Sequence, residues 1–131
     1  MRRFRLITVL LALAAPGPAP AGEVIAHPFV NLSADDIRNV YLREKQLAGS
    51  LRLVPVGNSA IQIEFLAKVL QTDEPKYQAR WIRKRFRDGL TPPPIMGSDA
   101  EVILFVRSTP GAVGYVSSTS NGDGVKVLEK F

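Results

Sequence analysis

The spacing of apolar and polar positions predicts two helices in the first half of the chain. Ser33 is a good N-cap residue and Asp36 stands three positions later, as in a capping box, so a helix over 33–42 is predicted. A second run of apolar residues at helical spacing covers 61–70, and Ser59 is a candidate cap for it.

Two more helices are predicted in the second half. Pro75 suits the first turn of a helix because it has no N–H to leave unpaired there, and Gly89 ends this helix. Ser98 and Glu101 form a capping box, followed by apolar residues that continue a helix to about Ser108.

Short β-branched or alternating segments predict strands between these helices. They lie at 24–26, 51–56, 112–117 and 125–128. The resulting order, β-α-β-α-α-α-β-β, favours an α/β domain with a central mixed sheet flanked by helices in a three-layer-like arrangement.

The first 21 residues have the three parts of a secretory signal peptide. Arg2, Arg3 and Arg5 are followed by an uncharged apolar run, and Ala19-Pro20-Ala21 offers small residues to a signal peptidase. We expect cleavage before Gly22, which leaves one domain over 22–131. The apolar run is about half of the roughly 20 residues that span a bilayer, so no membrane span is expected after cleavage.

Composition limits the chemistry of the mature domain. The chain contains no cysteine, which excludes disulfides, zinc–thiolate sites and a lipid anchor on cysteine. Its formal net charge is +5, but three of the 17 basic residues and none of the 12 acidic ones lie in the signal peptide, which leaves +2. This small excess does not suggest a nucleic-acid partner. We expect a periplasmic or secreted protein.

The densest run of charge lies in the third predicted helix. Arg80, Arg83, Lys84 and Arg87 are expected to form one solvated basic face. The whole basic run consists of Arg80, Arg83, Lys84, Arg85 and Arg87. Trp81 and Phe86, next to Ile82, are expected to pack inward and hold this helix on the sheet.

No catalytic constellation stands out in the sequence. His27 is the one histidine, so it has no metal-binding or catalytic partner of its own kind, and a surface or loop role is expected. Asp35 and Asp36 are adjacent, so they diverge on a helix and do not form a carboxylate pair. The sequence therefore predicts neither an enzyme nor a bound cofactor or metal.

Six segments along the mature chain carry a family pattern when they are taken in order. They are LSADDIRNVYL, LRLVPVGNS, IEFLAKVLQ, ARWIRKRF with DG and TPPP, SDAEVILFV and TPGAVGY. The most specific is TPGAVGY, Thr109 to Tyr115, and Trp81 and Phe86 before a Gly and a Pro run add to it. Together these segments resemble the phosphate-binding periplasmic proteins of ABC importers, in the broad PBP-like group. The resemblance implies a fold similar to one lobe of a type 2 periplasmic binding protein, in a short, single-lobe form.

The resemblance also points to a place for a small anion. In the family an Arg, a Ser and a Ser-Gly-Thr stretch that opens a helix bind the oxyanion just after the strand that matches LVPV. Here that place holds Gly57-Asn58-Ser59-Ala60, without the Arg and the Gly-Thr. Asn58, Ser59 and Ala60 are the candidate ligand-binding residues, through backbone N–H groups at a helix start. The alternative is that Ser59 merely caps its helix.

Two functions remain open from the sequence. One is an exported solute-binding-like protein related to phosphate ABC transporter substrate-binding proteins, with weak or lost binding of a small oxyanion such as phosphate. Neutral donors alone predict dissociation at about the millimolar level or no binding. The alternative is an envelope protein-interaction or signalling module that keeps the fold without a ligand.

Overall fold

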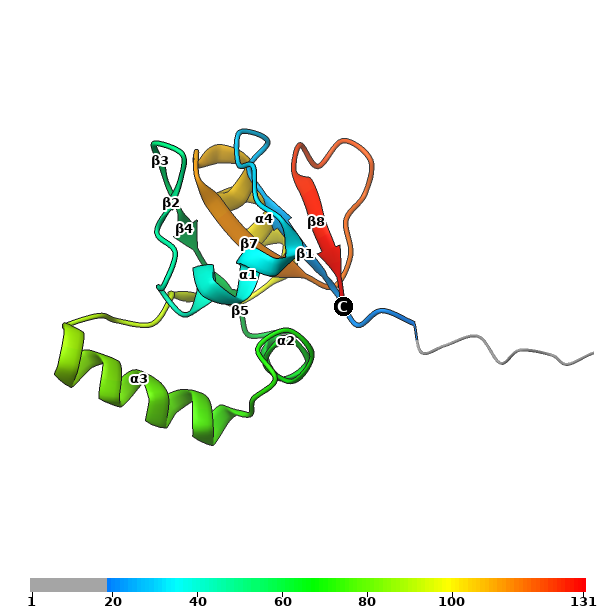
Figure 1. The fold of residues 1–131 in the computed structure, drawn as a ribbon. Coiled ribbons are helices and arrows are strands. Elements are labelled where there is room, and N and C mark those ends of the chain that lie inside the picture. Colours follow the sequence, from blue (N-terminus) through cyan, green and yellow to red (C-terminus); the bar gives the residue numbers. More distant parts are fainter. Residues whose placement is uncertain (1–18) are drawn as a thin grey trace, which may run out of the picture.

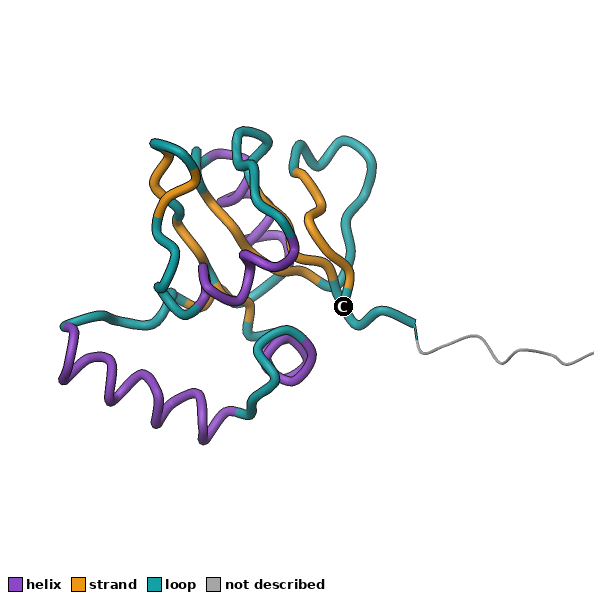
Figure 2. Tube along the Cα trace, viewed as in Figure 1, coloured by secondary structure: helices purple, strands orange, loops and turns teal. Residues whose placement is uncertain are grey.

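The computed structural model describes residues 19–131, and these form a mixed α/β fold (Figures 1 and 2). Only the last three positions of the expected signal peptide, 19–21, belong to the described residues; the rest of it lies outside them. The helices are α1 (Ala34–Tyr41), α2 (Gln62–Lys68), α3 (Glu74–Asp88) and α4 (Asp99–Ser108). The strands are β1 (Glu23–Ala26), β2 (Leu47–Ala48), β3 (Leu51–Arg52), β4 (Val54–Pro55), β5 (Gly57–Asn58), β6 (Ile95–Met96), β7 (Ala112–Val116) and β8 (Lys126–Lys130).

A four-stranded mixed sheet with the order β4-β7-β1-β8 forms the centre of the fold. Strand β1 is antiparallel to both β7 and β8, whereas β4 is parallel to β7. Two small pairs lie outside this sheet: the hairpin β2-β3 and the parallel pair β5-β6. The single strand predicted over 51–56 is therefore divided among β3, β4 and the residues that follow.

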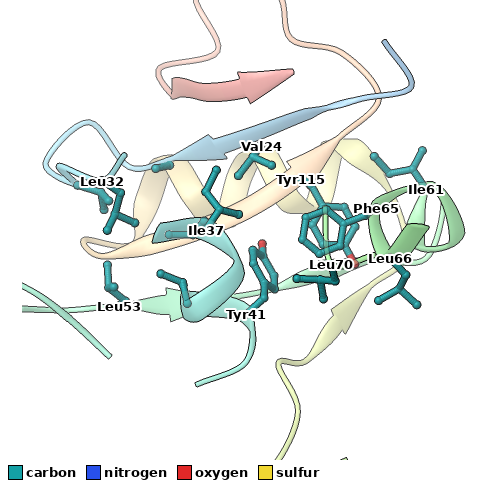
Figure 3. Close-up of a cluster of buried hydrophobic side chains, with 14 of the residues drawn as sticks. Val24, Leu32, Ile37, Tyr41, Leu53, Ile61, Phe65, Leu66, Leu70 and Tyr115 are labelled. Carbon is teal, nitrogen blue, oxygen red and sulfur yellow. The ribbon is translucent and has the colours of Figure 1, made fainter. Parts of the chain in front are cut away.

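Successive side chains along the central strands point to opposite faces of the sheet and pack into two separate hydrophobic cores. Val24, Val113 and Tyr115 point to the face covered by α1 and α2, where they join the larger cluster (Figure 3). Ile25 and Val116 point to the opposite face and pack with α4. Period-two alternation places successive residues on opposite faces, so one short strand serves both layers. The expected mixed sheet with helices on both faces is confirmed.

Local capping explains where three helices begin and where α3 ends. The side chains of Ser33 and Asp36 form the predicted capping box of α1. Asp73 caps α3 by accepting the Lys76 N–H at 2.9 Å, and Gly89 ends it with a left-handed φ of 68°. Ser98 Oγ accepts the Glu101 N–H at the start of α4. Helix α3 lies at the periphery of the molecule, beside α2 and apart from the central sheet (Figure 1).

Candidate functional site

The stretch from Gly57 to Ala60 begins in a strand pair, since Gly57 and Asn58 form β5 beside β6, and the turn follows only at Ser59 and Ala60. The Gly57 N–H donates to the carbonyl of Pro94 at 2.7 Å, and the Ser59 N–H donates to the carbonyl of Met96 at 2.9 Å. Helix α2 begins only at Gln62, and Ser59 makes no capping hydrogen bond to it. The capping role considered for Ser59 is therefore wrong, because the helix begins three residues later and Ile61 occupies its N-cap position.

Asn58 is the centre of this region, and it is completely buried. Its amide nitrogen donates to Asp99 Oδ1 at 2.8 Å and to the carbonyl of Tyr115 at 3.1 Å. Its amide oxygen accepts the Ala60 N–H at 3.0 Å. A side-chain amide has two N–H donors and one oxygen, so all of these groups have protein partners. Asn58 thus links β5 to β7 and to the start of α4.

The three predicted site residues, Asn58, Ser59 and Ala60, lie together, but their N–H donors are hydrogen-bonded to acceptors within the protein. The N–H groups of Ser59 and Ala60 are both engaged, as are those of the Asn58 amide. The carboxylate of Asp99, which also accepts the Ser117 N–H at 3.1 Å, lies beside them. A negative charge at hydrogen-bond distance from a candidate anion site opposes the approach of a second anion.

Sequence reasoning missed the residues that complete this cluster. The Tyr115 hydroxyl donates to the side-chain oxygen of Gln62, and both are buried. A Cβ atom at Gly57 would lie 3.0 Å from that hydroxyl and 3.3 Å from the Gln62 oxygen, so the glycine allows this close approach. Asp99 lies in the first turn of α4, where acidic residues are common, and nothing local in the sequence indicates its bond to Asn58.

The basic run on α3 is divided between the interior and the surface in an unexpected way. Lys84 is only 6% exposed, so its assignment to the solvated face is wrong. Its ammonium donates to the carbonyl of Leu42 at 2.5 Å and lies 5.5 Å from the centre of the Trp81 ring. The inward face of α3 is therefore Tyr77, Trp81 and Lys84, at spacings of four and three residues.

Phe86 and Ile82 were expected to face the core beside Trp81, and only Trp81 does. Trp81 is 3% exposed, whereas Ile82 is 57% and Phe86 88% exposed. The spacing of Ile82 and Phe86 correctly groups them on one face of α3, but this is the outward face. The predicted inward packing of Phe86 is wrong, because the stripe of α3 that carries Tyr77 and Trp81 is the one that packs into the core.

A cavity of about 360 Å³ lies where the basic row of α3 meets the segment after α1. Glu44 is the one acidic side chain in its lining; it pairs with Arg80 at 3.6 Å and with Lys84 at 3.8 Å. The other lining residues are Arg83 and Arg87, the latter hydrogen-bonded to Asp88. Four cations and one carboxylate give this cavity, termed the basic pocket here, a positive field that attracts anionic groups.

Two other hollows lie elsewhere on the described part of the protein. An open apolar groove of about 550 Å³ runs between β6 and α4, with Ile95, Met96, Leu104 and Phe105 in its lining. A smaller polar hollow of about 340 Å³ lies near the start of α1 and includes Arg38 and Glu129.

His27 has a structural role in the turn after β1. Its Nδ1 accepts the Phe29 N–H at 3.1 Å, and its ring lies edge-on to the Phe29 ring, with centroids 4.7 Å apart. It is 9% exposed, so the expected loop role holds but a surface position does not. Within residues 19–131, no group of three or more His, Asp or Glu side chains is arranged to hold a metal ion.

No helix in the described part of the chain has the length and apolar character needed to cross a bilayer.

The geometry of the described residues offers two candidate sites: the closed Asn58 cluster and the basic pocket on α3. Comparison with protein-family models gave no match, and a search of curated proteins found no significant relative.

Proposed function

We propose that this chain is an exported protein related to the phosphate-binding proteins of ABC importers, similar to one lobe of a type 2 periplasmic binding protein. It keeps the fold, has lost oxyanion binding at Gly57–Ala60, and acts as a protein-interaction module of the cell envelope. The observation that carries the proposal is the buried Asn58, whose amide is satisfied by Asp99, Tyr115 and Ala60.

The loss of binding follows from the balance of donors and charge at this cluster. An oxyanion needs N–H or guanidinium donors, and charge-assisted contacts are about twice as strong as neutral ones. The N–H groups of Ser59 and Ala60 would have to leave protein acceptors, and no arginine stands in this stretch. The Asp99 carboxylate adds repulsion, so phosphate gains little by entering.

The start of the packed domain supports the expected cleavage site. Ala19 and Pro20 are exposed, whereas Gly22 is buried. The Gly22 N–H donates to the carbonyl of Phe131 at 3.1 Å, and the Phe131 N–H returns a bond to the Gly22 carbonyl at 2.9 Å. Cleavage before Gly22 would release exposed Ala19 and Pro20 together with half-buried Ala21, whose N–H also donates to the Phe131 carbonyl, and would keep the two Gly22 bonds.

Titration calorimetry with inorganic phosphate on the 22–131 domain tests the loss of binding. We expect dissociation at about the millimolar level or weaker, because only neutral donors are available. Micromolar binding that Ser59→Pro abolishes would overturn the proposal and restore the predicted oxyanion site. Ser59→Ala, which keeps the backbone N–H, is the matched control.

Micromolar phosphate binding that survives Ser59→Pro and disappears in Arg83→Glu would place an anion site in the basic pocket. That outcome would also contradict the proposal of a module without a small ligand. The same titrations with sulfate and chloride separate a specific site from general attraction to the cations of α3, which salt screens.

A further inference from the structure

Helix α3 carries a second apolar stripe, on the face opposite its buried one. The stripe consists of Pro75, Ala79, Ile82 and Phe86, at spacings of four, three and four residues, and all four are exposed. This is the a/d spacing of a helix-to-helix seam. The stripe is termed the outer seam below.

The outer seam is held in a rigid, preformed helix. Asp73 caps the first turn, Gly89 closes the last, and Trp81 and Tyr77 anchor the opposite face in the core. The 15 residues of α3 make a rod about 22 Å long, or roughly two heptads. A partner therefore finds the seam already ordered, which lowers the entropic cost of binding.

Charge decides which partner suits this seam. Helix α3 carries six cations, and Glu74 and Asp88 are its only acidic residues; the cations are Lys76, Arg80, Arg83, Lys84, Arg85 and Arg87. Arg83 and Arg87 lie between the outer seam and the basic pocket, whose lining they share. A second copy of α3 would bring these like charges together, whereas an acidic segment would neutralise them.

The width of the apolar face distinguishes a helix from a membrane. A helix that lies in a bilayer interface buries a broad apolar face rich in large side chains. The outer seam is a narrow a/d stripe with two large members, Ile82 and Phe86, and arginines close beside it. A strict a/d stripe is typical of the seam between two helices.

We propose that the outer face of α3 docks an acidic amphipathic helix of a partner protein. The partner's apolar residues cover Ile82 and Phe86, and its carboxylates reach Arg83 and Arg87 and the mouth of the basic pocket. Arginine suits this contact because its planar guanidinium binds carboxylates in a bidentate manner. This inference rests on the proposed function as an interaction module and names the surface and the chemistry of the partner.

The test uses two synthetic helical peptides of three heptads, both with leucine at the seam positions, flanked by glutamate in one and by lysine in the other. Fluorescence anisotropy with the 22–131 domain measures their affinities. We expect the glutamate peptide to bind and the lysine peptide to bind at least about tenfold more weakly. Binding of the glutamate peptide should weaken as salt is added.

Matched variants locate the binding surface. Phe86→Ser should weaken the glutamate peptide about tenfold or more, as expected for a central aromatic contact. Ile63→Ser, which alters another exposed isoleucine, 72% exposed on α2, should change nothing. Arg83→Glu should weaken binding, whereas Arg52→Glu, the same charge reversal at an exposed residue of β3, should have a much smaller effect.

Several outcomes overturn the inference. They are no binding of the glutamate peptide, equal binding of both peptides, or binding that Phe86→Ser leaves unchanged. Tight binding to phosphatidylglycerol vesicles that Phe86→Ser abolishes, without peptide binding, would assign the face to a lipid surface. Concentration-dependent dimerisation lost in the same variant would assign it to a second copy. None of these results depends on phosphate, so they are separate from the test of the proposed function.

Discussion

The side-chain amide of Asn58 and the carboxylate of Asp99 are hydrogen-bonded at 2.8 Å across 41 residues of sequence. This bond joins the end of the β4–β5 segment to the first turn of α4. It uses the same residue that the family resemblance offers as part of an oxyanion site. The bond makes Asn58 a link between two elements of the fold.

Replacing Asn58 with alanine should destabilise the domain. The change removes two donors and one acceptor from a completely buried position and leaves the Tyr115 carbonyl and the Ala60 N–H without these partners. We expect a loss of about 2 to 3 kcal/mol in the free energy of unfolding, measured by urea denaturation. Ser59→Ala, at an exposed neighbour, should cost less than about 0.5 kcal/mol. Equal small effects would contradict a linking role for Asn58.

Trp81 and Phe86 should respond very differently to truncation. Trp81→Ala should cost about 3 to 5 kcal/mol because the ring is buried against the core. Phe86→Ala should change the free energy of unfolding by less than about 0.5 kcal/mol, because its side chain is 88% exposed. The comparison needs only thermal or urea unfolding of the two variants. A large effect of Phe86→Ala would mean that the outer seam is covered within the domain.

The tyrosines should make the fold sensitive to alkali. Burial raises the pKa of Tyr41 well above its usual value of 10.0, and it also raises the pKa of Tyr77 and of Tyr115. The folded state therefore keeps phenolic protons that the unfolded chain releases above about pH 10. Stability should be unaffected by these groups below that pH and should fall as the pH rises toward the folded-state pKa values.

Phenolate absorbance as a function of pH checks this prediction directly. These three are all the tyrosines of the chain, so the signal has no background from exposed ones. In the folded protein we expect little phenolate near pH 10 and then a steep rise as the domain unfolds. In concentrated urea the titration should be broad and centred near the ordinary value. A native titration with that same ordinary midpoint would show that the phenols are open to water.

Gly22 should tolerate no larger residue, although it lies at the expected cleavage site. A Cβ atom there would lie 2.7 Å from the Val116 carbonyl oxygen and from the Phe131 ring, and 2.8 Å from Ile61. Gly22→Ala should destabilise the 22–131 domain by about 1 to 3 kcal/mol. Gly97→Ala is the control, because its one close neighbour is the flexible end of Glu101. Similar stability of both variants would place Gly22 outside the folded domain.

The helices were the most predictable part of the fold because their signals are local. The capping boxes of α1 and α4, and Pro75 and Gly89 at the two ends of α3, act within a few residues of the chain. The β4–β5 segment was less predictable. Its division and the pairing of Gly57 and Ser59 depend on hydrogen bonds to the Pro94–Met96 segment, which no local pattern indicates.

The candidate sites were predictable only as groupings of residues. Helical spacing correctly places Ile82 with Phe86 and Arg83 with Arg87, because 3.6 residues per turn determine which side chains share a face. It does not say which face meets the core when a helix has two apolar stripes, as α3 has with Tyr77 and Trp81 on the other side. For the same reason Lys84 was assigned to solvent.

The sequence by itself determined the class of the fold, the approximate positions of the four helices and the central strands, and the capping boxes of α1 and α4. Only the tertiary structure decided that Asn58 is bonded to Asp99, that Lys84 is buried over Trp81, and that Phe86 faces outward. Helix and strand signals arise from backbone bonds and side-chain periodicity over short distances. The partners of a buried polar group depend instead on which distant segments the sheet and its covering helices bring together.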